Sequence, residues 1–131
     1  MTKYVIISGE LSSLDYDTNK KRSKALENFI GDILRLSLSE CQGRYKNDFE
    51  TSFKVEIRYQ ENISQLKLLA MQFEQESILL ISGKSKAKLL YLDDDIPPLH
   101  LGKYTKVNEF EYLDYESGTY EIESGEYYVC K

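Results

Sequence analysis

The chain has one histidine, two cysteines and no tryptophan among its 131 residues. A single histidine, His100, rules out a metal site built from two histidines of one chain and argues against a histidine-based catalytic triad. Cys41 and Cys130 stand far apart, with no Cys-x-x-Cys motif, which argues against zinc and predicts reduced thiols. We therefore expect a protein that needs neither a metal nor another cofactor.

Basic residues are in the minority, and long apolar runs are missing. The 17 Lys and Arg face 22 Asp and Glu, which gives a formal charge of -5 and argues against nucleic acid as a partner. The longest apolar runs, such as 78–81 and 89–92, have four residues each, whereas a membrane-spanning helix needs roughly 20. The N-terminus also lacks the apolar region of a signal peptide. These absences predict a cytoplasmic protein with no membrane partner.

What the chain does contain is typical of one soluble domain over residues 1–131. Hydrophobic residues make up 41% and charged residues 30% of the sequence, which matches an ordinary globular composition. Eleven tyrosines and five phenylalanines make the chain rich in aromatic side chains.

The spacing of apolar residues predicts an α+β fold. Helical spacing covers 17–38, with Asp17 or Thr18 as N-cap, and 62–75, with Asn62 as N-cap. The predicted strands are 3–8, 42–45, 49–59, 77–81, 87–92, 99–107, 119–122 and 126–129. The resulting order is a ferredoxin-like split β-α-β-β-α-β core with a C-terminal β extension. Right-handed crossovers would put both helices on one sheet face, so the tail or another subunit must cover the opposite face. We therefore expect an oligomer.

Two short motifs favour structural interpretations. Gly83-Lys84-Ser85 ends like a phosphate-binding loop, but the glycine required five positions earlier is absent, so it is interpreted as a hairpin turn. The acidic run 93–95 lacks the remaining ligands of a calcium loop and is interpreted as a solvated loop.

Two carboxylate positions leave both a structural and a functional interpretation open. Glu50 begins a strand shortly after Tyr45, and Glu74-Gln75 ends the second helix just before a buried strand. Such side chains either face solvent or point into a cleft at the end of a sheet. The basic run 19–22 at the start of the first helix is either a solvated turn or an anion contact, because cations are disfavoured at a helix N-terminus.

Several short segments, taken in order, resemble the phage-encoded enzymes that degrade S-adenosylmethionine, now described as lyases, and the related SAM-AMP lyases of type III CRISPR systems. SAM-AMP is adenylylated S-adenosylmethionine. The likeness covers nearly the whole chain. It rests on Tyr4–Ser8, Gly43-x-Tyr45 followed by Glu50, Phe73-Glu74-Gln75, Gly102-x-Tyr104-x-x-Val107, Gly118-x-Tyr120 and Tyr127-Tyr128-Val129.

The resemblance implies a homotrimer with active sites between subunits and a reaction that releases 5'-methylthioadenosine and homoserine lactone. The substrate's own carboxylate would attack its γ-carbon and expel the thioether, and a poorly hydrated aromatic pocket would favour this step. Free S-adenosylmethionine and SAM-AMP both remain candidate substrates. The basic turns 20–22 and 84–88 favour SAM-AMP slightly, because they could contact an extra phosphate.

The same resemblance assigns roles to individual residues. Tyr45 and Glu50 would be the catalytic residues, with Tyr45 near the sulfonium and Glu50 near the substrate ammonium. The substrate-binding residues would be Ser8, Gly9, Arg22, Glu74 and Gln75.

Three other functions stay open at this stage. If the reaction is hydrolysis, Glu50 or Glu74 would have to activate water as a general base. A non-catalytic sensor of adenosyl ligands is possible because fold does not fix function. An acidic protein-binding inhibitor would use the tyrosine-rich tail. The setting is either phage counter-defence or control of a CRISPR antiviral signal.

Overall fold

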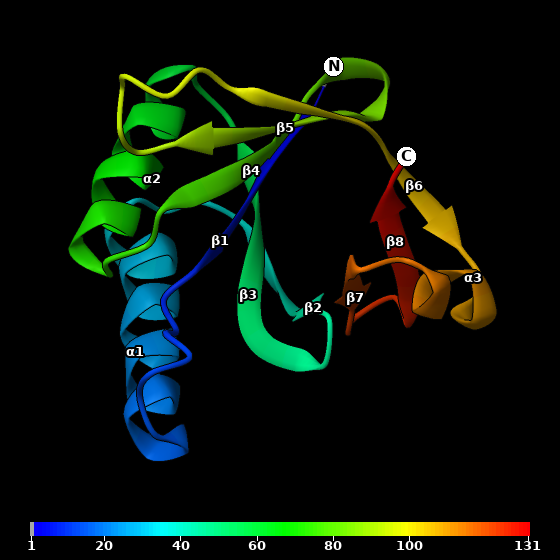
Figure 1. The fold of residues 1–131 in the computed structure, drawn as a ribbon. Helices are drawn as coiled ribbons and strands as arrows, with labels where there is room; N and C mark the ends of the chain where they lie inside the picture. The colour runs from blue at the N-terminus through cyan, green and yellow to red at the C-terminus, as the bar shows by residue number, and fades with distance from the viewer. Residues whose placement is uncertain (1) are drawn as a thin grey trace.

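Eight antiparallel strands form a closed barrel in the computed structural model, which describes residues 2–131 (Figure 1). Around the barrel the strands follow the order β1-β3-β2-β7-β8-β6-β5-β4, and β4 pairs with β1 to complete the circle. The strands are β1 (Lys3–Ser8), β2 (Leu38–Tyr45), β3 (Asp48–Ile57), β4 (Ser77–Ile81), β5 (Lys86–Tyr91), β6 (Leu99–Val107), β7 (Ser117–Glu121) and β8 (Glu126–Cys130).

The helices lie outside the barrel. They are α1 (Tyr16–Asn28), continued by the π-helical turn η1 (Phe29–Ile33), α2 (Glu61–Gln72) and the short α3 (Glu109–Asp114). Helices α1 and α2 stand together beside β1, β3 and β4, whereas α3 lies on the other side, next to β8 (Figure 1). None of the helices in the described part of the chain has the length and apolar character needed to span a membrane.

The prediction of a ferredoxin-like split β-α-β-β-α-β core is wrong. That architecture requires an open sheet whose far face is left bare, but both edges of the expected sheet are paired here. Strand β2 pairs with β7, and β4 pairs with β5, which continues through β6 and β8 back to β7. The tail that was expected to be an extension is therefore half of the barrel. Closure satisfies every strand edge.

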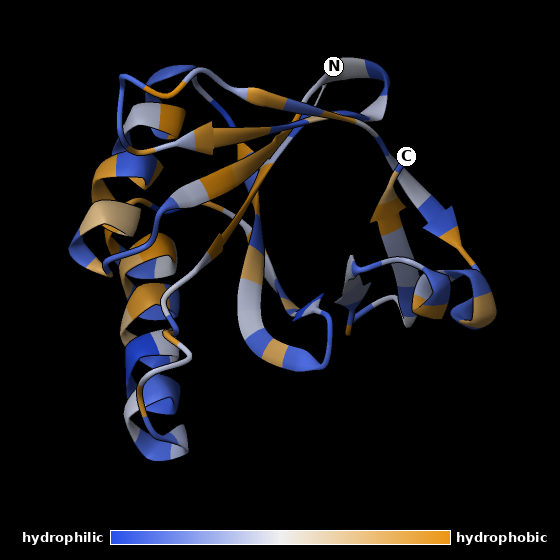
Figure 2. Cartoon of the chain, in the orientation of Figure 1, coloured by the Kyte–Doolittle hydropathy of each residue, from blue (hydrophilic) through white to orange (hydrophobic). Residues whose placement is uncertain are grey.

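The main hydrophobic core lies between the helices and the outer face of the barrel. Side chains alternate along a strand, so Val5 and Ile7 of β1 and Phe53 and Val55 of β3 point out of the barrel toward the helices. They pack with apolar residues of α1, η1 and α2, among them Leu26, Ile30, Leu66, Leu69 and Ala70. Figure 2 shows hydrophobic residues on α2, on the later turns of the α1 segment and on the adjoining strands, whereas the first turns of α1 are mostly hydrophilic.

Local interactions set the helix ends somewhat differently from the prediction. The N-cap of α1 is Asp15, whose carboxylate accepts the Thr18 N–H at 2.7 Å. The helical segment ends well before residue 38, because Arg35 adopts a positive φ of 55° and β2 begins at Leu38. Asn62 lies inside α2, and its side chain accepts the N–H groups of the two residues that precede the helix cap.

The interpretation of Gly83-Lys84-Ser85 as a hairpin turn is confirmed. The segment Gly83–Ser85 is a 3₁₀ turn, η2, that connects β4 with β5. Both cysteines are free thiols, and burial followed by the nearby Glu121 charge raises the pKa of Cys41 to about 12.

Replacing Leu66 by alanine should destabilise the fold far more than the same change at Leu68. Leu66 is fully buried between α2 and the barrel, whereas Leu68 on the same helix is 62% exposed. We expect Leu66→Ala to lower the free energy of unfolding by about 2–5 kcal/mol and Leu68→Ala to change it by less than about 0.5 kcal/mol. Equal losses in urea-induced unfolding would contradict the position of the core.

Candidate active site

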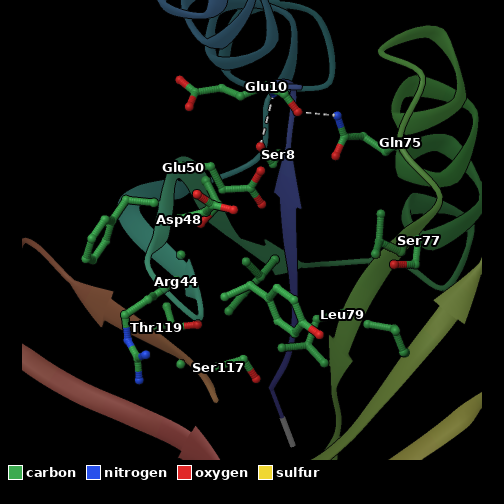
Figure 3. Close-up of a pocket in the computed structure, with 18 of the residues that line it drawn as sticks. Ser8, Glu10, Arg44, Asp48, Glu50, Gln75, Ser77, Leu79, Ser117 and Thr119 are labelled. Carbon is green, nitrogen blue, oxygen red and sulfur yellow. Dashed lines mark hydrogen bonds between the residues drawn. The ribbon is translucent and has the colours of Figure 1, made fainter. Parts of the chain in front are cut away.

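The barrel encloses a cavity of about 700 Å³, a volume suited to a small molecule (Figure 3). It opens at the end of the barrel where the β2–β3 hairpin, the segment after β1 and the segment before β4 lie. The strands contribute Ile6, Ser8, Gly43, Tyr45, Asp48, Glu50, Ser52, Ser77, Leu79, Leu89, Leu101, Tyr104, Ser117, Thr119, Tyr128 and Cys130.

A cluster of tyrosines around an ion pair forms the inner end of the cavity. Lys54 Nζ lies 2.9 Å from Glu121 Oε2, and the Tyr104 hydroxyl donates to the same oxygen at 2.6 Å. The Lys54 ammonium also lies 4.5 Å from the ring centroid of Tyr4 and within 6 Å of the rings of Tyr104 and Tyr128. Burial, followed by the hydrogen bond to Glu121, raises the pKa of Tyr104, so its phenol stays protonated. We call these five residues the tyrosine floor.

Glu10 is a buried carboxylate near the mouth whose hydrogen bonds are all made within the protein. Its two oxygens accept the Thr51 N–H at 3.0 Å and the Ser23 hydroxyl at 2.8 Å, and Lys20 Nζ lies 3.3 Å away. Burial alone would raise the pKa of Glu10, but these three partners together lower it below its usual value. Glu10 is therefore a permanent negative charge.

Glu50 is the carboxylate of the site with the most perturbed titration. It lies opposite Gly43 in the β2–β3 pair, and its side chain lines the cavity near Ser8 (Figure 3). Burial, followed by repulsion from Glu10, raises its pKa to about 6, although the Ser8 hydroxyl opposes this change. Such a group changes charge close to physiological pH.

Further negative charge surrounds the mouth of the cavity. Asp48 lies two residues before Glu50 on the same strand, so both side chains are on the inner face. Glu74 and Glu76 also line the cavity. Glu74 is 3.4 Å from Arg22, but its side chain is largely exposed, so this pair neutralises it only weakly.

Arg44 is the only Lys or Arg among the described residues that line the cavity. Its guanidinium donates to the carbonyl oxygens of Tyr112 at 2.7 Å and Tyr115 at 2.6 Å and lies over the Tyr112 ring, whereas its buried Nε has no hydrogen-bond partner among the described residues. Arg44 therefore holds α3 against the barrel and keeps its positive charge. Carboxylates still outnumber this one cation among the lining residues, so the mouth of the cavity favours a cationic ligand.

Arg22 connects the two chain segments at the mouth. Its Nε donates to the Gly9 carbonyl at 2.7 Å, and a terminal nitrogen donates to the Phe73 carbonyl at 2.6 Å. The guanidinium also lies 5.4 Å from the centroid of the Phe73 ring. At Gly9 a Cβ atom would lie 3.0 Å from this ring, so the glycine allows the two segments to pack closely.

Gln75 strengthens the same junction from the other side. Its side-chain amide donates to the Glu10 carbonyl at 3.0 Å and to the Phe73 carbonyl at 3.2 Å (Figure 3). The preceding Glu74 has a positive φ of 59°, which turns the chain out of α2 and into β4.

The structure brings most of the residues expected at the site to one place. Ser8, Tyr45, Glu50, Glu74 and Gln75 all line the cavity, although they come from three separate parts of the chain. Gly9 and Arg22 do not line it and instead support the junction at its mouth. Their roles toward a substrate stay predictions.

Other cavity residues were not anticipated from the sequence. Asp48 and Ser52 flank Glu50 at steps of two on β3, so strand alternation could have found them. Thr119 and the inward-facing Tyr104 and Tyr128 required the closed barrel, which the local pattern did not reveal.

The lysine-rich turn lies away from the cavity. Lys84, Lys86 and Lys88 belong to η2 and β5, and none of them lines it. The turn follows Ile81, the last residue of β4, and Ile81 pairs with Tyr4 of the tyrosine floor. Ser77, the first residue of β4, lies at the mouth, so the turn is at the other end of β4 from the mouth.

In the other basic segment, at the start of α1, Lys20 is held by Glu10 and by the Thr51 hydroxyl.

Comparison with known proteins shows the family to which this chain belongs. No curated protein matches the chain. The sequence model of the S-adenosylmethionine lyase family, in contrast, matches residues 5–131, which include every residue that lines the cavity. The chain therefore belongs to the S-adenosylmethionine lyase family.

Proposed function

We propose that the protein is a lyase that cleaves the sulfonium carbon–sulfur bond of S-adenosylmethionine inside the barrel cavity. Family membership supports an enzyme that acts on this small molecule. The observation that carries the proposal is the charge of the cavity mouth, where the carboxylates of Asp48, Glu50 and Glu74 outnumber the one Lys or Arg among the described lining residues, Arg44. A ligand with a sulfonium and an ammonium group is complementary to such a mouth.

The reaction requires no group on the protein to form a bond to the substrate. An oxygen of the substrate carboxylate attacks the γ-carbon of the methionine chain and forms a carbon–oxygen bond. The carbon–sulfur bond breaks, and its electron pair stays on sulfur, which becomes a neutral thioether. The products are 5'-methylthioadenosine and homoserine lactone. Opposite charges combine in this step, so a cavity with little water favours it by orientation and desolvation.

Glu50 and Tyr45 are assigned to the methionine end of the substrate. The Glu50 carboxylate would bind the substrate ammonium and hold the chain folded for attack. Tyr45 is 57% exposed at the hairpin beside the mouth, and Lys46 Nζ lies 5.4 Å from its ring centroid. A sulfonium that reached the face of this ring would gain about 0.5–2 kcal/mol from the contact.

The remaining assigned residues position the substrate or shape the mouth. Ser8, Glu74 and Gln75 line the cavity and can reach a bound ligand. Gly9 and Arg22 would act indirectly, by fixing the segment after β1 against the segment before β4. In this arrangement Arg22 offers no free guanidinium to a phosphate.

Free S-adenosylmethionine fits this cavity better than SAM-AMP. The adenylyl group adds a phosphate with a negative charge, which several mouth carboxylates would repel. The two basic segments that favoured SAM-AMP are either held by internal contacts, as for Lys20 and Arg22, or placed away from the cavity, as for the turn at 84–88.

Side-by-side turnover of the two substrates tests this choice. We expect kcat/KM for S-adenosylmethionine to exceed that for SAM-AMP by about tenfold, which corresponds to about 1.4 kcal/mol of charge repulsion.

A second experiment distinguishes the lyase from a hydrolase. The reaction is run in ¹⁸O-labelled water, and chromatography with mass detection follows methylthioadenosine and homoserine lactone. Early product without label supports the lyase, whereas label that appears before the lactone can open indicates hydrolysis. An adenosyl ligand that binds without turnover would instead identify a sensor.

Glu50→Gln should remove the charge that binds the substrate ammonium. At pH 7.5 we expect kcat/KM to fall about 10- to 100-fold, because a hydrogen bond to a charged group contributes roughly 1.5–3 kcal/mol. The control is Glu56→Gln, on the same strand and also exposed, but outside the cavity. The kcat/KM of the parent should decline as pH falls through about 6, where Glu50 takes up a proton, and the ratio of parent to variant should decline with it. A constant ratio from pH 5 to 8 would contradict the assignment.

The same raised pKa has a consequence for stability that can be measured without substrate. The folded state binds the Glu50 proton more tightly than the unfolded state, so the contribution of this group to stability is present below pH 4.5 and is lost as pH rises through about 6. The free energy of unfolding of Glu50→Gln minus that of the parent should therefore increase as pH rises from 4.5 to about 6, and it should stay constant at higher pH. Urea-induced unfolding at pH 4.5, 6 and 7.5 measures it, and an opposite slope would show that Glu50 is not desolvated.

A homotrimer with active sites between subunits, as the resemblance implies, stays a prediction, although the cavity proposed here is lined by residues of one chain. The bare sheet face that first suggested an oligomer is absent, because the barrel is closed. Support comes instead from the resemblance and from Tyr45 and Phe49, two aromatic residues that are more than half exposed on the hairpin at the mouth. Light scattering should give a mass about three times the 15.3 kDa of the chain. A mass of one chain at micromolar concentration would contradict it.

A further inference from the structure

Ser52 carries a buried hydroxyl without a hydrogen-bond partner. It is 3% exposed and lines the cavity from β3, where it pairs with Ser8 on one side and Cys41 on the other. Within residues 2–131 its Oγ has no hydrogen-bond partner. The neighbouring Ser8 hydroxyl, in contrast, donates to the Thr51 carbonyl and accepts the Glu10 N–H. A buried polar group left unpaired costs free energy, so it points to a missing partner.

Position along the strand places Ser52 in the inner part of the cavity. On the inner face of β3 the order from the mouth is Asp48, Glu50, Ser52 and then Lys54 of the tyrosine floor. The charged carboxylates therefore lie outside Ser52. From Ser52 to Asp48 the strand covers about 13 Å, which leaves room for a nucleoside with its chain folded toward the mouth.

The walls around this inner part are apolar and aromatic. Ile6, Leu79, Leu89 and Leu101 line it from four strands. Tyr104 and Tyr128 lie face to face, with ring centroids 4.4 Å apart and an angle of 5° between the planes, and both border the cavity. Tyr104 is buried, whereas Tyr128 keeps part of its surface exposed. A flat heterocycle suits this surface, because aromatic rings stack well on tyrosine.

We propose that the inner part of the cavity binds the adenine base of the substrate, with the Ser52 hydroxyl hydrogen-bonded to its 6-amino edge and the Tyr128 ring packed against it. The ribose and the sulfonium then extend outward, and the ammonium reaches Glu50. This inference rests on the proposed function for the identity of the ligand. It assigns a base-recognition residue, Ser52, that neither the family match nor the sequence motifs identify.

Calorimetric titration of the whole protein with 5'-methylthioadenosine tests the inference without the reaction. This probe has the base and the ribose but neither the ammonium nor the sulfonium. We expect Ser52→Ala to weaken its binding about 3- to 10-fold, the usual effect of one hydrogen bond. Tyr128→Leu should weaken it about 5-fold or more, because it removes the stacking surface.

Two further measurements separate base recognition from a structural role. The 5'-methylthio nucleoside of unsubstituted purine, in which a hydrogen atom replaces the 6-amino group and no partner for Ser52 is left, should bind the parent less tightly than methylthioadenosine, and Ser52→Ala should narrow that difference in binding free energy. Ser52→Ala should also leave the melting temperature of the ligand-free protein unchanged or raise it, because it removes an unpaired buried hydroxyl. The control is Ser64→Ala, an exposed serine of α2 outside the cavity, which should keep the affinity of the parent for methylthioadenosine.

The outcomes distinguish this inference from the proposed function. If S-adenosylmethionine is cleaved but Ser52→Ala binds both nucleosides as the parent does, the base pocket is overturned and the lyase stands. If methylthioadenosine binding depends on Ser52 but S-adenosylmethionine stays intact, the pocket stands and the lyase is overturned. A parent that binds neither nucleoside at millimolar concentration overturns the pocket directly.

Discussion

Closure of the barrel by the pairing of β2 with β7 is the constraint on which the rest of the structure depends. Without it the inner faces of β1, β2 and β3 would be open to solvent, and the polar side chains on them would not line a common cavity. With it, strand alternation divides the chain into two environments. Outward-facing residues of β1, β3 and β4 meet the helices and form the hydrophobic core, whereas inward-facing residues enclose the cavity. Stability and ligand binding are therefore assigned to opposite faces of the same strands.

Glu10 and Glu50, two of the carboxylates at the mouth, differ in how far hydrogen bonds and nearby charges compensate their negative charge. Glu10 receives hydrogen bonds from Thr51, Ser23 and Lys20, so it is charged and structurally occupied. Glu50 lies in the field of Glu10 with little compensation, and its pKa is raised to about 6. A carboxylate that the fold leaves poorly compensated gains the most from a cationic ligand. This difference makes Glu50 a better candidate for binding than Glu10, although both lie near the same opening.

The sequence predicted local features well and global arrangement poorly, for a physical reason. Alternating residues such as Phe53 and Val55 identify a strand, and helical spacing identifies α2, because both patterns depend on near neighbours. Barrel closure depends on contacts between residues far apart, such as Gly43 with Thr119, and no local pattern encodes them. The short helix α3 was missed for a similar reason, since its Tyr112 is buried by residues far away in the sequence, among them Arg44 of β2 and Val129 of β8. Of the site, Glu50 and Gln75 were found through motifs, whereas Ser52 was not, because a lone serine gives no signal in sequence.

The tyrosine floor also bears on the order in which ligands leave the cavity. The Lys54–Glu121 ion pair and the rings around it lie on the barrel away from the β2–β3 hairpin, and Tyr104 and Tyr128 border the cavity there. If the proposed cleavage takes place in this cavity with the base innermost, the lactone forms nearer the mouth than the nucleoside does. The lactone would then be released first, and the nucleoside would compete with the next substrate molecule. The depth of the cavity would in this way set the strength of inhibition by the nucleoside product.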